Sequence, residues 1–284
     1  MKILVLGKGK SGTTVFLFKV AGGLPNCQAF PGGHPGKYLG DYENAVYKHT
    51  YNERKGRTFD AYLDHFTEID YDRKIWMARD PRDSAVSGML YRWHRGHRGC
   101  RKQYRAHLEL VQKKERDPAS VPFHLLCRYV GHDGWPISTE EVLETERFRY
   151  QRLYDFVKSL GKEWFIFKYE DMIEKKLDAL HEYLGFHIKD DAEIPTVKKQ
   201  AKVARKKASG DWRHWFTEED VELFRPIYLP YMELIGYDCD DWTLSSEAKI
   251  EPEFSSLYIK RLVKKNTLNT IRSFKVLRPF IKTS

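Results

Sequence analysis

The sequence lacks several features that would place it in large classes of proteins. No apolar run approaches the length of about 18 residues that a membrane-spanning helix needs. The four cysteines are scattered without a Cys-x-x-Cys pair, and there is no Asn-x-Ser/Thr glycosylation site. The amino terminus enters an apolar strand pattern at once, which leaves no room for a secretory signal peptide. These absences predict a cytoplasmic protein with reduced thiols.

Positive charge is concentrated at one end of the chain. The formal net charge is +9, yet eight Lys and Arg and no acid follow residue 256, so about +1 remains for the rest. We expect one domain over residues 1–245 and a basic amphipathic tail over 246–284. The tail suits an acidic membrane surface or a partner protein, although its apolar residues could also pack on the body. The body lacks the basic stripe with interleaved aromatics that nucleic-acid binding would require.

Strand and helix patterns alternate along the chain, which is 41% hydrophobic and therefore able to bury a large core. This alternation predicts an α/β fold, a three-layer α/β/α sandwich around a mostly parallel sheet, similar to the P-loop NTPases. Residues 94–135 are polar, basic and irregular, and we expect an insertion that covers a substrate. Strands are expected at 2–6, 45–51, 74–79 and 164–172, and helices at 13–23, 59–69, 80–93, 138–161, 177–186 and 217–238.

The loop after the first strand, GKGKSGTT at residues 7–14, almost spells a P-loop. Its two glycines have the P-loop spacing, but Thr13 stands where a P-loop has lysine, and the lysines lie inside the loop. Small residues, threonine hydroxyls and a helix amino terminus suit a nucleotide-type polyanion. The missing Lys-Ser/Thr pair argues against an ordinary Mg–ATP site.

A second cluster, RDPRDSAVS, begins with Arg79 at the end of an apolar strand. Ser87 follows about two turns into the next helix. A guanidinium and a hydroxyl that converge at a sheet edge would hold a single phosphate group. The alternative is that Asp80, Arg82 and Asp83 form only a solvated helix cap.

Together the two clusters resemble the sulfotransferase family that uses 3′-phosphoadenosine 5′-phosphosulfate (PAPS). KSGTT is similar to the family's 5′-phosphosulfate loop, and ARDPRDSAVS to its 3′-phosphate motif. FKYEDM is similar to the strand whose tyrosine approaches adenine, and RKKASGDWRHWF to the late loop that closes on the 3′-phosphate. These motifs occur in the family's order between residues 7 and 216.

The resemblance implies a role for each matching residue. Lys10 would approach the bridging oxygen of the leaving group, and Tyr169 would lie near adenine. Val15 stands where cytosolic members often have Trp against adenine, and Lys207 and Arg213 replace the late loop's Gly and final Lys. The residues implied to bind PAPS are Lys10, Ser11, Gly12, Thr13, Thr14, Arg79, Ser87, Tyr169, Arg205 and Lys206.

The general base stays open. Cytosolic members place a histidine in a Lys-Thr-His run at a strand end, and here VYKHT has Lys48 directly before His49. Strand alternation would turn that histidine to the opposite face, unless the strand has already ended. Glycan-modifying members use a glutamate, which makes Glu53 the second candidate. His65, or no base at all, remains a further alternative.

The segment RWHRGHRGC offers His94, His97 and Cys100 as potential metal ligands, but the interleaved arginines and the lack of a fourth ligand favour a basic loop, and we expect no metal. We therefore predict a PAPS-dependent sulfotransferase that releases PAP and acts on a hydroxyl or amine of a small molecule or glycan. The alternatives are a P-loop nucleotide kinase and a non-catalytic protein that binds anions or membranes. The candidate acceptor-binding residues are His97, Arg101, Tyr104 and Trp135.

Overall fold

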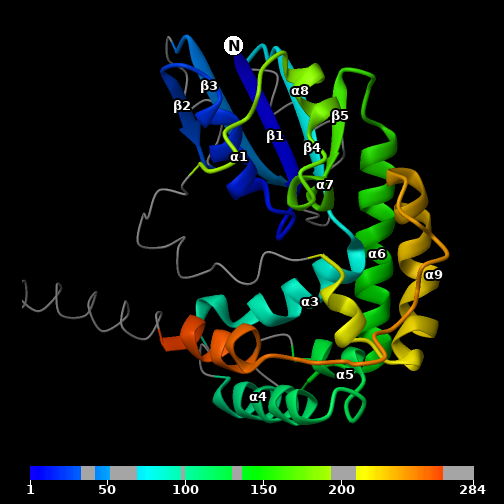
Figure 1. The fold of residues 1–284 in the computed structure, drawn as a ribbon. Coiled ribbons are helices and arrows are strands. Elements are labelled where there is room, and N and C mark those ends of the chain that lie inside the picture. Colours follow the sequence, from blue (N-terminus) through cyan, green and yellow to red (C-terminus); the bar gives the residue numbers. More distant parts are fainter. Residues whose placement is uncertain (33–41, 52–68, 97–99, 130–135, 193–208, 265–284) are drawn as a thin grey trace, which may run out of the picture.

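Five strands form a single sheet in which every neighbouring pair is parallel (Figure 1). The structure is a computed structural model, and it describes residues 1–32, 42–51, 69–96, 100–129, 136–192 and 209–264. The strand order β2-β3-β1-β4-β5 puts the first strand at the centre. The strands are β1 (Lys2–Lys8), β2 (Cys27–Phe30), β3 (Asn44–Tyr51), β4 (Arg73–Ala78) and β5 (Trp164–Lys168).

One face of the sheet is covered by α1 (Thr13–Gly22), α7 (Tyr169–Ile173) and α8 (Asp178–Leu184). Because side chains alternate along a strand, Ile3 and Val5 point to this face, where they join a buried cluster with apolar residues of the three helices. The helix α1 follows β1 directly. Its amino terminus therefore lies at the carboxyl edge of the sheet.

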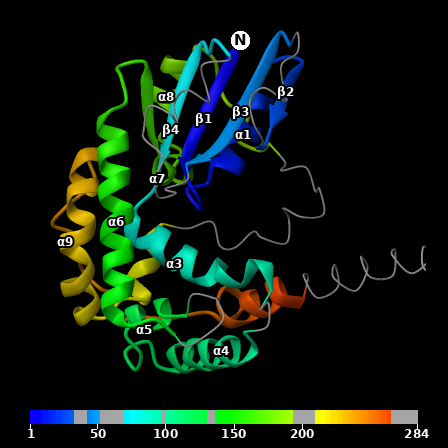
Figure 2. The same ribbon diagram turned by 180° about the vertical axis from the view of Figure 1, so that it is seen from behind.

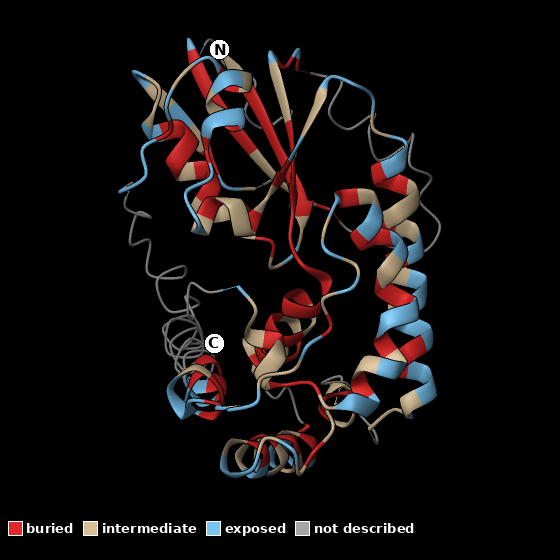
Figure 3. Ribbon diagram, turned by 45° about the vertical axis from the view of Figure 1, so that its right-hand side comes forward, coloured by how far each residue is buried: buried red, intermediate tan, exposed pale blue. Residues whose placement is uncertain are grey.

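The opposite face packs on α6 (Thr139–Lys158), which in turn packs along α9 (Glu218–Ile235). Phe156 of α6 lies 4.6 Å from the ring of Tyr51 and 5.4 Å from that of Trp76, measured between centroids. Figure 3 shows buried residues along the strands and exposed residues on the outer sides of these two helices. The α/β prediction, with helices on both faces of a parallel sheet, is confirmed.

The remaining helices lie beyond the carboxyl edge of the sheet, in both ribbon views (Figures 1 and 2). Residues 256–264 are helical and lie beside them, and Glu115 accepts hydrogen bonds from Ser255 and Ser256 there. The elements of this layer are α3 (Pro81–Tyr91), the 3-10 turn η3 (Arg92–Arg95), α4 (Arg101–Arg116), α5 (Phe123–Cys127), η5 (Asp211–His214) and η6 (Pro252–Phe254).

Two expected boundaries differ from the structure. The body does not end at residue 245, because Ile250, Tyr258 and Ile259 are buried in the same core as α6 and α9. Residues 100–129, within the expected lid insertion, are largely helical and not irregular, and Val111 and Phe123 are fully buried. The apolar residues of 256–264 therefore pack on the body, which was one of the two alternatives for the tail.

Two smaller expectations also changed, and a third is not tested. Strand β2 is not among the strands expected from the sequence. The strand expected at 164–172 ends at Lys168, because α7 begins at the next residue. The helix expected at 59–69 falls almost entirely outside the described residues. Within the described ranges, no helix has both the length and the apolar character needed to cross a bilayer, and Cys27, Cys100, Cys127 and Cys239 are thiols.

Candidate anion-binding site

The glycine-rich loop wraps around the amino terminus of α1. Lys10 and Gly12 both have left-handed backbone conformations, with φ of 77° and 82°. Ser11 closes the turn, because its backbone N–H and its hydroxyl both donate to the carbonyl oxygen of Lys8, at 3.2 and 2.7 Å. This path leaves the first N–H groups of α1 at the sheet edge, where a helix amino terminus attracts anions.

Gly12 has a second reason to be glycine. A Cβ at this position would lie 2.4 Å from Cδ2 of Tyr169, which begins α7. The backbone of the loop is therefore in direct contact with the tyrosine ring. The resemblance assigned Tyr169 to the adenine, and the structure places this residue against the loop.

Arg79 joins the two sequence clusters. Its Nη1 donates a 2.7 Å hydrogen bond to the carbonyl oxygen of Lys10, and its guanidinium carbon lies 4.5 Å from the ring centroid of Tyr169. The residue is only 8% exposed, and its buried Nε has no hydrogen-bond partner among the residues that the structure describes. A buried donor without a partner is costly, so a ligand oxygen would complete this arrangement.

Two lysines of the loop also lie over tyrosine rings. Lys8, Tyr91 and Tyr150 were not among the site residues expected from the sequence. An aromatic ring attracts a cation without neutralising it, so each contact stabilises a cation that still carries its charge. The contacts are Lys8 Nζ over Tyr150 of α6, at 3.9 Å, and Lys10 Nζ over Tyr91 of α3, also at 3.9 Å.

Ser87 lies on the same side of α3 as Tyr91, because the two residues are four apart in a helix. Ser87 is buried. Since Tyr91 contacts Lys10, this side of α3 faces the loop, and the helix that supplies Ser87 also supplies the ring. The spacing from Ser87 was the signal in the sequence that could have identified Tyr91.

The acidic and basic residues between Arg79 and Ser87 are buried, so the solvated-cap alternative is wrong in that respect. Asp80 does cap α3, since it accepts from the backbone N–H of Arg82 at 2.8 Å. Arg82 pairs with the Asp80 carboxylate at 2.7 Å, and its guanidinium lies over the rings of both Trp212 and Trp242. These residues fix the start of α3 and hence the position of Arg79.

Asp83 anchors the end of the late basic segment. Its carboxylate accepts from the backbone N–H groups of Gly210, at 2.7 Å, and Trp212, at 3.0 Å. Burial, together with the charge of Asp80, raises the pKa of Asp83 to about 7, despite the opposing effect of Arg79. The first turn of α3 is therefore tied to the chain that directly follows residues 205 and 206.

His49 and Lys48 lie on opposite faces of β3. In the parallel register His49 pairs with Leu6, which packs toward α6, whereas Lys48 pairs with Val5, which packs toward α1. Lys48 donates to the carbonyl oxygen of Pro31 at 3.2 Å, and burial lowers its pKa. The structure therefore does not bring Lys48 to His49.

Lys8 lies on the same face of the sheet as His49 and points to α6. The pKa of Glu146 on that helix is lowered overall. Burial alone would raise it, but the charges of Lys8 and Arg149 act in the opposite direction. Arg149 pairs with Glu146 at 2.7 Å, and the hydroxyl of Tyr228 donates to its other oxygen at 3.3 Å. The charge of Lys8, at the end of β1, thus acts on a half-buried carboxylate of α6.

Several candidate residues lie outside the described parts of the chain: Glu53, His65, His97, Trp135, Arg205 and Lys206. Arg101 and Tyr104 belong to α4. This helix lies on the side of α3 that faces away from the sheet (Figures 1 and 2). Tyr104 packs edge-on against Trp93, with ring centroids 5.5 Å apart. His94 stacks on Tyr91 at 4.3 Å, and Cys100 is buried.

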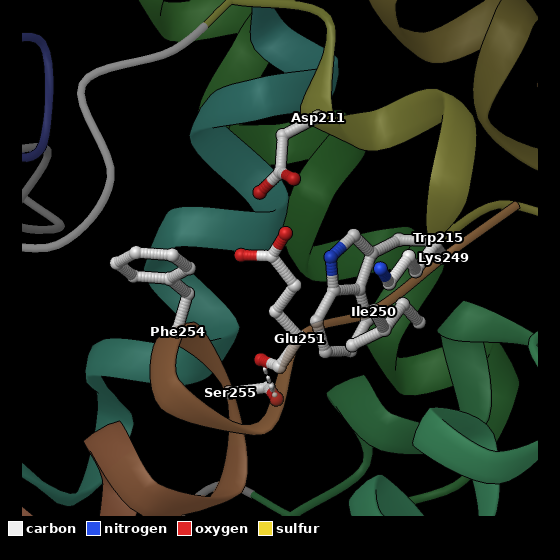
Figure 4. A pocket seen from close by; sticks show the side chains of 7 residues that line it. All are labelled: Asp211, Trp215, Lys249, Ile250, Glu251, Phe254 and Ser255. Carbon is white, nitrogen blue, oxygen red and sulfur yellow. Dashed lines mark hydrogen bonds between the residues drawn. The ribbon is translucent and has the colours of Figure 1, made fainter.

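Two hollows occur elsewhere on the molecule. The smaller, near 10 Å³, lies between η5 and η6, where Asp211 and Glu251 point toward each other (Figure 4). The larger, near 520 Å³, lies beside α7 and the end of α9 and is lined by residues that include Glu170 and Tyr237. Neither is lined by Lys10, Arg79 or Ser87.

The chain matches no model of a known protein family and no curated protein. Among solved structures it is similar to mouse sulfotransferase SULT7A1 complexed with PAP, at 15% sequence identity and a TM-score of 0.48. The similarity covers 82% of this chain and 84% of the mouse chain.

Proposed function

We propose that this protein is a PAPS-dependent sulfotransferase, which moves a sulfuryl group from PAPS to a hydroxyl or amine of a small-molecule or glycan acceptor, without a metal. The observation that carries the proposal is the 2.7 Å hydrogen bond from Arg79 to the Lys10 carbonyl. Through this bond, the glycine-rich loop and the strand end that carries Arg79 form a single candidate site. A nucleotide with phosphate groups at both its 3′ and 5′ positions would occupy both of them.

The residues present fit such a donor. The unpartnered Nε of Arg79 and the hydroxyl of Ser87 suit the 3′-phosphate, and Arg205 and Lys206 are proposed to join them. The backbone and hydroxyls from Ser11 to Thr14 suit the 5′-phosphosulfate at the amino terminus of α1. Tyr169, in contact with both Arg79 and the loop, is proposed to lie near the adenine.

PAPS supplies a sulfuryl group on a good leaving group. During transfer the bond between sulfur and the bridging oxygen breaks, its electrons stay on the departing 5′-phosphate, and a new bond forms from the acceptor oxygen or nitrogen to sulfur. Lys10 is proposed to stabilise the charge on the departing phosphate. Removal of one such well-placed group from an active site typically costs about 10²–10³ in rate.

The acceptor proton needs a base, and a positioned base contributes about 10²–10⁴ in rate. His49 is our first candidate, because it lies on the face of the sheet that also carries Lys8, near the ends of the strands. Glu53 remains the second candidate. A role for Lys48 as helper would require its side chain to reach across the sheet, and the register does not support this.

Transfer can be tested before the natural acceptor is known. Purified protein would be incubated with PAPS and pooled alcohols, phenols, amines and glycans, and products that gain the mass of one SO₃ would be identified together with released PAP. We expect at least one acceptor class to be sulfated by the wild type. The Lys10→Met variant should lose about 10²-fold or more in rate. Equal turnover by both proteins would contradict the assignment of Lys10.

A further inference from the structure

The side chain of Lys10 rests on a fixed aromatic ring. His94 stacks on Tyr91, with ring centroids 4.3 Å apart and planes 7° from parallel. At this distance His94 occupies one face of the ring, so the Lys10 ammonium, 3.9 Å from the same centroid, lies on the other face. The ring is held from behind while it contacts the lysine.

The ring and the lysine backbone are each held by other residues. Tyr91 is the last residue of α3, and its carbonyl oxygen lies 3.1 Å from Nδ1 of His94, the same residue that stacks on its ring. Arg79 holds the backbone of Lys10 through its carbonyl oxygen. The side chain can thus change partner without movement of the loop.

We propose that Tyr91 is a positioning residue, which holds the Lys10 ammonium in the empty site and releases it to the 5′-phosphate end of the nucleotide on binding. The inference rests on the proposed function. A charge-assisted hydrogen bond to a phosphate oxygen is stronger than a partly exposed cation–π contact, so the lysine exchanges the ring for the anion. The contact keeps the ammonium inside the site, and the ammonium leaves the ring only when the anion binds.

This exchange has a thermodynamic consequence. A contact present only in the empty protein must be broken on binding, so it weakens nucleotide affinity by its own free energy. For a partly exposed cation–π contact this corresponds to about two- to fivefold in dissociation constant. Tyr91→Leu should therefore bind PAP about two- to fivefold more tightly than the wild type, whereas Tyr91→Phe, which keeps the ring, should bind with nearly wild-type affinity.

The direct test follows the lysine ammonium groups by NMR in ¹⁵N-lysine-labelled protein, with the Lys10 signal assigned by Lys10→Arg. Stacking over a ring shifts that signal upfield in the empty wild type. We expect the shift to be kept in Tyr91→Phe, lost in Tyr91→Leu, and lost in the wild type when PAP is added. Tyr154→Leu is the matched control, since Tyr154 contacts Lys158 at 5.4 Å on α6, among residues with no role in the site.

The outcomes separate the two proposals. If the wild type binds PAP while the Lys10 signal stays upfield, or is never upfield, Tyr91 does not release the lysine and the inference is overturned alone. An equal or weaker affinity for PAP in Tyr91→Leu, with an unchanged melting temperature, also contradicts it. If the wild type does not bind PAP at all, the proposed function fails and the inference fails with it.

Discussion

At the scale of single residues, the site is organised by contacts between cations and tyrosine rings. Arg79, Lys8 and Lys10 each lie over a ring from a different helix, α7, α6 and α3. Three like charges near one loop repel each other, and the rings offset part of that repulsion while the charges persist. The arrangement suits a site that receives a polyanion.

Gly12 offers the sharpest test of the loop at this scale. Gly12→Ala puts a Cβ 2.4 Å from the Tyr169 ring and keeps a left-handed φ that costs a non-glycine residue about 1–2 kcal/mol. We expect a lower melting temperature and at least about tenfold weaker binding of PAP. Gly9→Ala is the matched control, since its Cβ would only touch Thr50 at 3.7 Å. Equal effects of the two substitutions would contradict this account of the loop.

The raised pKa of Asp83 predicts that the stability of the protein depends on pH. Its pKa is raised from 3.8 to about 7 in the folded protein, so folding takes up a proton between these two values. The contribution is fully present below pH 3.8 and is lost as pH rises through about 7, by at most about 1.4 kcal/mol per pH unit. The free energy of unfolding of the wild type minus that of Asp83→Asn should therefore be more positive at pH 5.5 than at pH 8.

Denaturant unfolding of both proteins at the two pH values measures that difference, and titrating groups that do not interact with Asp83 cancel in the comparison. A difference that is constant, or that grows toward pH 8, would contradict a raised pKa for Asp83.

At the scale of elements, the helical layer beyond the sheet is held together by buried polar anchors. Glu115 of α4 accepts hydrogen bonds from the backbone and hydroxyl of Ser256, at 2.7 and 3.1 Å, and also from the hydroxyl of Ser255. These bonds fix the start of the helix at 256–264 against α4. Tyr258 and Ile259 then pack into the core.

Glu115→Ala should therefore lower the free energy of unfolding by about 1–3 kcal/mol, because the backbone N–H and the hydroxyl of Ser256 lose their acceptor. The hydroxyl of Ser255 keeps the carbonyl oxygen of Glu251 as an acceptor. Glu109→Ala on the same helix is the control, since Glu109 is exposed, and we expect a change within about 0.5 kcal/mol. Thermal or urea unfolding measures both. Similar losses in the two variants would mean that the helix at 256–264 is not anchored through Glu115.

The same elements show where sequence patterns succeed and fail. The strands β1, β3 and β4 and the helices α1, α3, α6 and α9 follow from apolar runs, caps and periodicity. The helix α4 was missed because its buried side includes Gln103, His107 and Lys114, which weakens the hydrophobic pattern. Strand β2 was missed because four residues between turn signals carry little periodicity.

At the scale of the whole molecule, the candidate site lies where the central strand, α1, α3 and α7 meet at the carboxyl edge of the parallel sheet, the usual place for ligands in such folds. The sequence predicted Arg79 and the loop, because both belong to continuous motifs. The spacing from Ser87 could have placed Tyr91 on the same side of α3, but not its contact with Lys10 or that of Tyr150 with Lys8, since those contacts depend on how α3 and α6 pack. The opposite orientation of Lys48 and His49 followed from strand alternation, and the register places their partners in different clusters.

The central claim is that one site binds a nucleotide with both a 3′- and a 5′-phosphate, and calorimetric titration tests it most directly. The wild type and Arg79→Ala would be titrated with PAP in the presence of EDTA, and with ADP and ATP–Mg as comparisons. We expect metal-independent binding of PAP by the wild type that is much tighter than that of ADP and at least about 10²-fold weaker in Arg79→Ala. Binding of ATP–Mg but not PAP would instead indicate a nucleotide kinase, and no binding of any of the three would contradict the account altogether.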